Sequence, residues 1–270
     1  MARDVGAVVP AAGRGKRLGS REAKALVPLA GKPLVFHTLQ ALQDVPAIRW
    51  IVVVVRPEDR ARVLKLVRHH RLTKVSAVVS GAASRAESVA RGIAALPAQA
   101  RWVVIHDGAR PCVTSRLIGQ VLLKAKRHGA VACGLPASQT VKAVDEEQQV
   151  RLTLDRDSLW LVQTPQAFRR DWLSDALVRV NPAPLVSRPR GAKSPVSSSA
   201  TKYPSRALSQ RGGVNHAFDQ LSDDAALLEW VGFPVRMIPG DPLNIKVTTR
   251  EDLMLAEAIL RSRLQKSEVR

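Results

Sequence analysis

Short apolar runs rich in Val and Ile recur along the first half of the chain, and Gly, Pro or charged residues separate them. Near-continuous apolarity of this kind predicts strands that are buried on both faces of a sheet. The runs occupy residues 5–10, 49–57, 74–81, 101–111 and 129–136.

Segments with helical spacing lie between these runs. Residues 57–70 start with Pro57 and bring Val63 and Val67 onto one face, and residues 84–96 repeat this spacing. The order β-α-β-α-β-α-β requires crossover helices, so it predicts an α/β fold with a doubly wound, mostly parallel, Rossmann-like sheet. The ligand site of such a sheet lies beyond the carboxyl ends of its strands.

Two segments interrupt this rhythm. Residues 137–162 alternate apolar and polar positions on both sides of a polar DEEQQ turn, which predicts a protruding β-hairpin arm. Residues 181–215 are rich in Pro, Ser and Arg and contain no acidic residue, which predicts a disordered basic insertion. We interpret residues 1–270 as one domain that carries both appendages.

The chain has a formal net charge of +19 over 270 residues. Such a charge indicates attraction to anions and would also suit a nucleic-acid-binding protein. The chain has only one Tyr, four Phe and five Trp, however, and no run interleaves them with Lys and Arg. We therefore do not expect it to bind nucleic acid, and we interpret the basic insertion as a solvated linker.

The two cysteines, Cys112 and Cys133, have no metal-ligand spacing and are expected to be small buried apolar residues of a protein from a reducing compartment. The first residues lack the long apolar segment of a secretory signal, and no apolar run is long enough to span a bilayer. We expect a cytoplasmic protein that makes no contact with a membrane.

The loop after the first predicted strand contains Gly13 and Gly15, which allow a tight turn and a close approach to an anion. Arg17 and Lys24 add positive charge to the same loop. Its spacing matches neither the dinucleotide-binding pattern nor the P-loop pattern. On its own it predicts either a phosphate cradle or a glycine turn with solvated charges.

Two later loops lie at the same predicted edge of the sheet. In the first, Ser84 and Glu87 have capping-box spacing, which leaves Arg85 and Ser88 free to act. In the second, Asp107 ends an apolar strand and could hold a divalent cation or a ribose hydroxyl. Alternatively, Asp107 caps a helix or forms an ion pair with Arg110.

These loops belong to a longer series of motifs that resembles the 2-C-methyl-D-erythritol 4-phosphate cytidylyltransferase family. The series contains, in the order of the family, VVPAAGRGKRLG, Lys24, RAESV, HDGARP, TVK, LDRDSLW, QTPQAF, SDDAALLEWVG and NIKVT. The resemblance covers almost the whole chain outside the predicted insertion.

The resemblance implies direct, in-line attack of the substrate's phosphate on the α-phosphorus of CTP, with release of pyrophosphate and with Mg²⁺ bound to the nucleotide. Arg17 and Lys24 would stabilise the transition state, and Asp107 would also contact the metal. The residues that would line the CTP site are Ala11, Ala12, Gly13, Gly15, Gly81, Arg85, Ser88, Asp107 and Gly108.

The resemblance also implies that Thr140, Arg156 and Lys246 position the sugar-alcohol phosphate. In the family the arm crosses to a partner subunit, so Thr140 and Arg156 would complete the neighbour's site and the protein would be a homodimer. Without the resemblance, Arg156 would be interpreted as an ion-pair partner of Asp155 or Asp157, and Lys246 as a solvated charge.

The chain departs from the family's pattern at several positions. Alanines at 23 and 25 replace the usual residues on both sides of Lys24, and Ala82 and Ala83 replace a Gly-Asp pair. Gly108 replaces an alanine, and Pro242 with Leu243 precedes NIKVT where an Asp is common. These changes bear on nucleotide affinity rather than mechanism. A ribitol 5-phosphate cytidylyltransferase, which shares the fold and most loop motifs, is the alternative within the superfamily.

Overall fold

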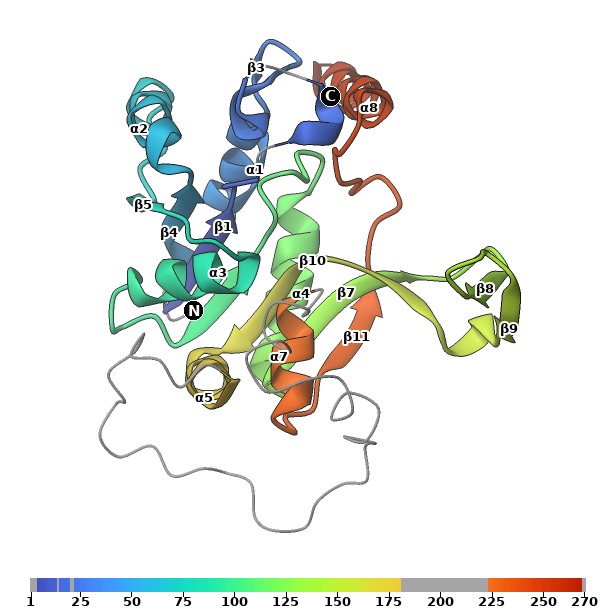
Figure 1. The fold of residues 1–270 in the computed structure, drawn as a ribbon. Helices are drawn as coiled ribbons and strands as arrows, with labels where there is room; N and C mark the ends of the chain where they lie inside the picture. Colours follow the sequence, from blue (N-terminus) through green and yellow to red (C-terminus); the bar gives the residue numbers. More distant parts are fainter. Residues whose placement is uncertain (1–3, 14, 20–21, 181–222, 269–270) are drawn as a thin grey trace.

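The computed structural model describes residues 4–13, 15–19, 22–180 and 223–268 (Figure 1). The predicted insertion at 181–215 lies outside the described residues. Seven strands of the described chain form one sheet in the order β11-β7-β10-β6-β1-β4-β5. They are β1 (Val5–Pro10), β4 (Ile48–Val55), β5 (Val75–Ser80), β6 (Trp102–Ile105), β7 (Ala130–Pro136), β10 (Trp160–Arg169) and β11 (Arg236–Pro239).

The pairing of these strands confirms the predicted, mostly parallel sheet. Strand β1 pairs in parallel with β4 and β6, and the pairs β4–β5 and β7–β11 are also parallel. Only β10 runs antiparallel to its neighbours within this sheet, β6 and β7. The carboxyl ends of β1, β4, β5 and β6 therefore meet at one edge, where the sequence predicts the site.

Helices cover both faces of the sheet, as expected for a doubly wound fold (Figure 1). One face packs against α1 (Leu34–Gln43), α2 (Arg60–His69) and α4 (Ser115–His128). The other packs against α3 (Arg85–Ala94), α5 (Arg170–Val180) and α7 (Asp224–Trp230). Successive side chains of β4 point to opposite faces of the sheet, so Val53 packs in the first layer and Val54 in the second.

The remaining elements are short, apart from the C-terminal helix α8 (Arg250–Glu268), which packs near the turn of β2 (Pro28–Leu29) and β3 (Lys32–Pro33). Single turns of 3-10 helix are η1 (Lys16–Leu18), η2 (Lys24–Leu26), η3 (Pro57–Asp59) and η4 (Arg156–Ser158). None of the described helices combines the length and apolar character that a membrane span requires.

The predicted hairpin arm is present as the antiparallel pair β8 (Val141–Val144) and β9 (Val150–Leu154). These strands form a separate sheet that projects away from the domain body (Figure 1). The arm ends earlier than residue 162, because Trp160 and Leu161 already pair with β7 as part of β10.

Candidate active site

A pocket of about 280 Å³ lies at the carboxyl ends of the parallel strands. It combines small apolar side chains with cations from loops that are far apart in the sequence. Its lining consists of Pro10, Ala11, Ala12, Gly13, Lys24, Ala25, Ala82, Ala83, Ser84, Arg85, Ser88, Asp107, Gly108, Ala109 and Lys246. Of the predicted site residues, Gly15, Arg17, Gly81, Thr140 and Arg156 are not part of this lining.

The glycine-rich loop after β1 brings Lys24 to the pocket. Gly15 has a φ of +64°, and a β-carbon at this position would lie 2.8 Å from Lys24 Cβ. Glycine is therefore needed at 15 both for the backbone conformation and for the close packing of Lys24. Gly13 differs, because a β-carbon there would meet no atom within 4 Å.

The surroundings of Lys24 in the pocket disfavour its charged form. Burial lowers the pKa of Lys24 below its ordinary value, and the nearby Lys246 and Arg17 lower it further, while Asp107 opposes this change. Among the described residues no carboxylate forms an ion pair with Lys24, whereas Lys246 is paired. Lys24 thus presents a half-buried ammonium group to an incoming anion.

Arg17 lies on η1, close enough to Lys24 to act on its pKa, and its side chain is exposed. The structure therefore brings the two predicted catalytic cations into one electrostatic environment but places only Lys24 in the pocket wall.

The loop after β5 is held together by Ser88 and by the predicted capping box. Ser84 Oγ accepts a hydrogen bond from Glu87 N, and Glu87 Oε2 accepts one from Ser84 N, at 3.2 and 3.4 Å. Ser88 Oγ donates to Ser84 O and accepts from Ala82 N, both at 2.9 Å. Both hydrogen-bonding functions of the Ser88 hydroxyl are therefore used to shape this loop.

Gly81, after β5, and Gly108, after β6, allow their loops to approach the loop after β1 closely. A β-carbon at Gly81 would lie 2.8 Å from Ala12 Cβ, and one at Gly108 would lie 2.9 Å from Ala11 Cβ. The replacement of the family's alanine by Gly108 thus fits the close packing against Ala11.

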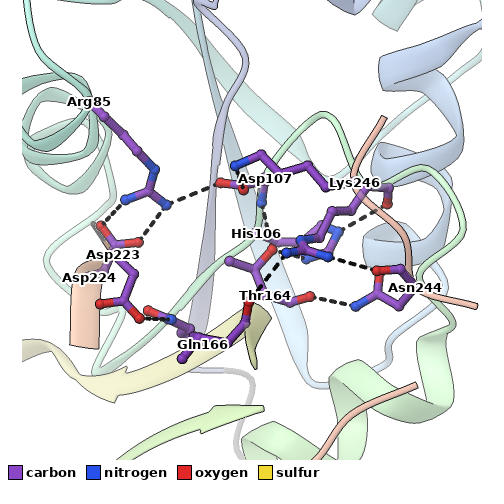
Figure 2. Close-up of polar contacts among 11 residues, drawn as sticks. Arg85, His106, Asp107, Thr164, Gln166, Asp223, Asp224, Asn244 and Lys246 are labelled. Carbon is purple, nitrogen blue, oxygen red and sulfur yellow. Dashed lines mark hydrogen bonds and ion pairs between the residues drawn. The ribbon is translucent and has the colours of Figure 1, made fainter. Parts of the chain in front are cut away.

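Asp107 joins two cations of the pocket lining, Arg85 and Lys246 (Figure 2). Its Oδ2 lies 2.7 Å from Lys246 Nζ, and its Oδ1 lies 3.1 Å from Arg85 Nη2. Although burial favours the neutral acid, Arg85 and Lys246 hold the pKa of Asp107 well below its usual range. The ion pair with Arg110 considered from the sequence does not form; Arg110 Nη1 instead donates to Asn244 O at 2.8 Å.

Asp224, a buried partner of the pocket residue Arg85, was not expected from the sequence. It lies outside the pocket lining and forms a two-point ion pair with Arg85, at 2.9 Å from Nη1 to Oδ1 and 2.8 Å from Nη2 to Oδ2 (Figure 2). The motif SDDAALLEWVG contains it, but nothing in the local pattern shows that the start of α7 lies within reach of Arg85 at the start of α3.

A buried network of hydrogen bonds fixes the backbone of Asp107. Asp107 N donates to Thr164 Oγ1, which donates in turn to His106 Nδ1, both at 3.0 Å (Figure 2). His106 Nε2 then donates to Arg110 O at 3.2 Å. Burial lowers the pKa of His106 to about 4, so the ring is neutral and this bonding pattern is fixed near neutral pH. Asn244 Nδ2 donates to Thr164 O at 2.7 Å and anchors the segment before Lys246.

Thr140 and Arg156 lie on the arm rather than in the pocket, and both are exposed. Arg156 Nη1 donates to Ser138 O at 3.3 Å. The ion pairs of Arg156 with Asp155 or Asp157 considered from the sequence do not form in the described part of the chain; Asp155 Oδ1 accepts from Asp157 N instead.

The pocket contains one carboxylate that could contact a metal ion, Asp107. Within the described ranges, no group of three or more His, Cys, Asp and Glu side chains is arranged to hold a metal. Mg²⁺ in nucleotide sites is commonly held by one or two carboxylates together with phosphates and water. The residues therefore fit an ion that arrives with a nucleotide and do not form an independent metal centre.

A doubly wound sheet with a cation-rich pocket at its carboxyl edge is typical of a Rossmann-like nucleotide-binding protein. The family model for 2-C-methyl-D-erythritol 4-phosphate cytidylyltransferase (IspD) matches residues 5–186 and 206–262. The chain belongs to this family and is a CTP-dependent nucleotidyltransferase.

Individual relatives agree with the family model. The chain is 36% identical over 256 residues to the 2-C-methyl-D-erythritol 4-phosphate cytidylyltransferase of Syntrophus aciditrophicus, covering 94% of this chain and 95% of the relative. It is 38% identical over 260 residues to that of Pelotomaculum thermopropionicum, covering 96% and 95%. The crystal structure of the Thermus thermophilus enzyme matches with a TM-score of 0.67 and 28% identity, covering 96% and 99%. The ribitol phosphate and nucleic-acid alternatives gain no support from these matches.

Proposed function

We propose that the pocket is the CTP site and that the chain transfers the cytidylyl group of CTP to 2-C-methyl-D-erythritol 4-phosphate, a step in isoprenoid precursor synthesis. The observation that supports this most directly is the half-buried Lys24, which faces the pocket without an ion-pair partner among the described side chains. An anion with several phosphates would supply the missing negative charge.

In the proposed reaction, an oxygen of the sugar-alcohol phosphate attacks the α-phosphorus of CTP. A new P–O bond forms to the α-phosphorus. The bond between the α-phosphorus and the oxygen that bridges it to the β-phosphate breaks, and pyrophosphate leaves. Negative charge develops on the non-bridging oxygens of the α-phosphate, so cations fixed beside them lower the barrier. Lys24 and Arg17 fill this role, and no covalent intermediate with the protein is needed.

The small residues of the pocket would form the nucleotide-binding wall. Ala11, Ala12 and Gly13 supply it from the first loop, while Gly81 and Ser88 shape the second loop so that Ala82 can face the pocket. Asp107 and Gly108 would lie against the ribose and the triphosphate.

Asp107 is also the residue that would hold Mg²⁺ bound to the triphosphate. Such an ion would neutralise phosphate charge and withdraw electrons from the reacting phosphorus. Lys246, which now contacts Asp107 at 2.7 Å, would then be free to bind the phosphate of the second substrate.

The arm is proposed to reach a second subunit of a homodimer. Its two strands expose Val144, Val150 and Leu152 by 54, 57 and 56%. Apolar side chains on a projecting two-stranded hairpin favour burial against another surface, since such a hairpin has little stability of its own. In this arrangement Thr140 and Arg156 would position the sugar-alcohol phosphate in the partner's pocket.

A cytoplasmic location is part of the same proposal, because cysteines that stay free fit a reducing compartment. Cys112 and Cys133 are both free and buried, and burial raises the pKa of their thiols to about 11 and about 12. Neither thiol is activated for reaction, which agrees with the expected role as small apolar residues.

The test is release of pyrophosphate from CTP and Mg²⁺ by the purified protein, with methylerythritol 4-phosphate and ribitol 5-phosphate offered in parallel. Release with the first substrate alone supports the proposal. Release with ribitol 5-phosphate alone would keep the chemistry but reject the substrate, and no release with either would reject the proposal.

A further inference from the structure

We propose that Asp224 is a positioning residue, which holds the Arg85 guanidinium so that Arg85 shares Asp107 with Lys246 instead of sequestering it. This inference rests on the proposed CTP site. It adds a residue that does not line the pocket and that acts on the nucleotide only through Arg85.

The contacts of Arg85 are divided unequally. Both terminal nitrogens bind Asp224, at 2.8 and 2.9 Å, whereas only Nη2 reaches Asp107, at 3.1 Å. Asp224 is 4% exposed, and Arg85 is paired with it in the parallel, two-point geometry that fixes a guanidinium plane. Burial opposes the charge of Arg85, but Asp224 and then Asp107 raise its pKa, so it stays a cation.

Asp224 is itself held firmly. Asp223 caps α7 by accepting from Ala226 N at 3.0 Å, and Gln166 Nε2 donates to Asp223 at 2.8 Å. Gln166 Oε1 accepts from Ala225 N at 3.1 Å. The first turn of α7 is thereby attached to β10, so the Asp224 carboxylate is a fixed anchor rather than a mobile counter-ion.

The four charged groups form an alternating row of Asp224, Arg85, Asp107 and Lys246, of which the last three line the pocket (Figure 2). Without the Asp224 carboxylate, Arg85 has both terminal nitrogens available for the nearest remaining carboxylate, Asp107. A two-point pair between Arg85 and Asp107 would occupy the oxygens that Lys246 and a nucleotide-bound cation need.

The main variant is Asp224→Asn, which keeps the side-chain volume and removes the charge. We expect the Kd for CTP with Mg²⁺, measured by calorimetry, to rise about tenfold. If Asp224 only balanced charge, its removal would leave the pocket more positive and CTP would bind more tightly. Tighter or unchanged binding would therefore overturn the proposal.

The neighbouring Asp223→Asn is the matched control. It removes the charged acceptor of the Gln166 Nε2 hydrogen bond. The new amide oxygen can still cap Ala226 N, and Gln166 Oε1 still accepts from Ala225 N, so the carboxylate that contacts Arg85 stays in place. We expect Asp223→Asn to lower the Tm with little change in the Kd for CTP. An equal increase of Kd in both variants would mean that general loosening of α7 is the cause, and would reject a specific role for Asp224.

A double-mutant cycle tests whether Asp224 acts through Arg85. In an Arg85→Gln background, Asp224→Asn should change the Kd for CTP by less than about twofold, since the group it positions is gone. Additive effects would overturn the proposal. Should Asp224→Asn fail to fold, Asp224→Glu, which keeps the charge but displaces the carboxylate, takes its place in the cycle. Wild-type protein that neither binds CTP nor releases pyrophosphate would refute the proposed function itself.

Discussion

At the scale of single residues, Lys24 connects the structure most directly to a measurable pH dependence. Burial first, and then Lys246 and Arg17, lower the pKa of Lys24. A lowered pKa means that the ammonium form is complete at low pH and is lost as the pH rises through that pKa. We therefore predict an alkaline decline of kcat/KM for CTP, which reports the ligand-free protein, beginning below the ordinary pKa of lysine.

The measurement is a pH profile of kcat/KM for CTP, taken at CTP concentrations well below KM. Lys24→Arg, which stays charged, should move the decline to higher pH, and Lys24→Ala should lower kcat by about two orders of magnitude or more. The Tm of Lys24→Ala should hardly change, because Lys24 has no ion-pair partner among the described residues. A decline that persists unchanged in Lys24→Arg would assign it to another group.

A second prediction at this scale separates backbone strain from site geometry. Gly15 and Gly31 both have positive φ, +64° and +77°, but only a β-carbon at Gly15 would strike Lys24; one at Gly31 would meet nothing within 4 Å. Ala substitution at either should cost roughly 1 kcal/mol of stability. Only Gly15→Ala should also lower kcat strongly. Equal kcat in the two variants would show that the position of Lys24 is not critical.

Residue-level prediction from the sequence succeeded where a loop follows a strand. Asp107 and Lys24 were both expected at the carboxyl edge, and both line the pocket. The pairing of Arg85 with Asp224 could not be predicted, because it joins the starts of two helices that the sequence separates widely. Local spacing carries no information about such a contact.

At the scale of elements, apolar runs predicted the parallel strands well because those strands are buried on both faces. Strand β10 has a different pattern and was not predicted as part of the main sheet. Its Gln163 and Gln166 are 7% and 0% exposed, and hydrogen bonds to Asp241 and Asp223 satisfy their amides. A strand whose buried positions are polar resembles a surface segment until its partners are known.

The arm yields the third prediction. If Arg156 positions substrate in the partner's pocket, Arg156→Ala should raise the KM for the sugar-alcohol phosphate, and both it and Lys24→Ala should be nearly inactive alone at low concentrations of that substrate. The two chains together should form heterodimers with one intact site. Random pairing on co-expression makes about half of the dimers heterodimers, and each heterodimer has one complete site out of two. The mixture should therefore recover about a quarter of the wild-type activity.

Pyrophosphate release by the co-purified mixture is the readout, with the two variants purified separately as references. An inactive mixture that contains heterodimers would show that Arg156 acts in the pocket of its own chain.

Replacing Val150 and Leu152 with Asp should in addition shift the protein from dimer to monomer in sedimentation analysis, because these residues are more than half exposed on the arm.

At the scale of the whole molecule, most of the Lys and Arg residues behind the net charge of +19 lie outside the pocket, whose lining contains the cations Lys24, Arg85 and Lys246. The family model leaves residues 187–205 unmatched, and this segment lies within the predicted insertion at 181–215. It contains Arg188, Arg190, Lys193 and Lys202 and no acidic residue. The segment thus adds charge without contributing a family motif, which agrees with its interpretation as a linker.

We accordingly predict that deletion of residues 187–205 leaves kcat and the Tm nearly unchanged. Removal of four positive charges should at most slow the encounter with the anionic CTP, so kcat/KM would fall modestly at low salt and the difference would vanish as added salt screens the field. Steady-state kinetics across a series of salt concentrations measure both effects. A deletion variant that remains folded but loses turnover at every salt concentration would show that the segment takes part in catalysis and that its interpretation as a linker is wrong.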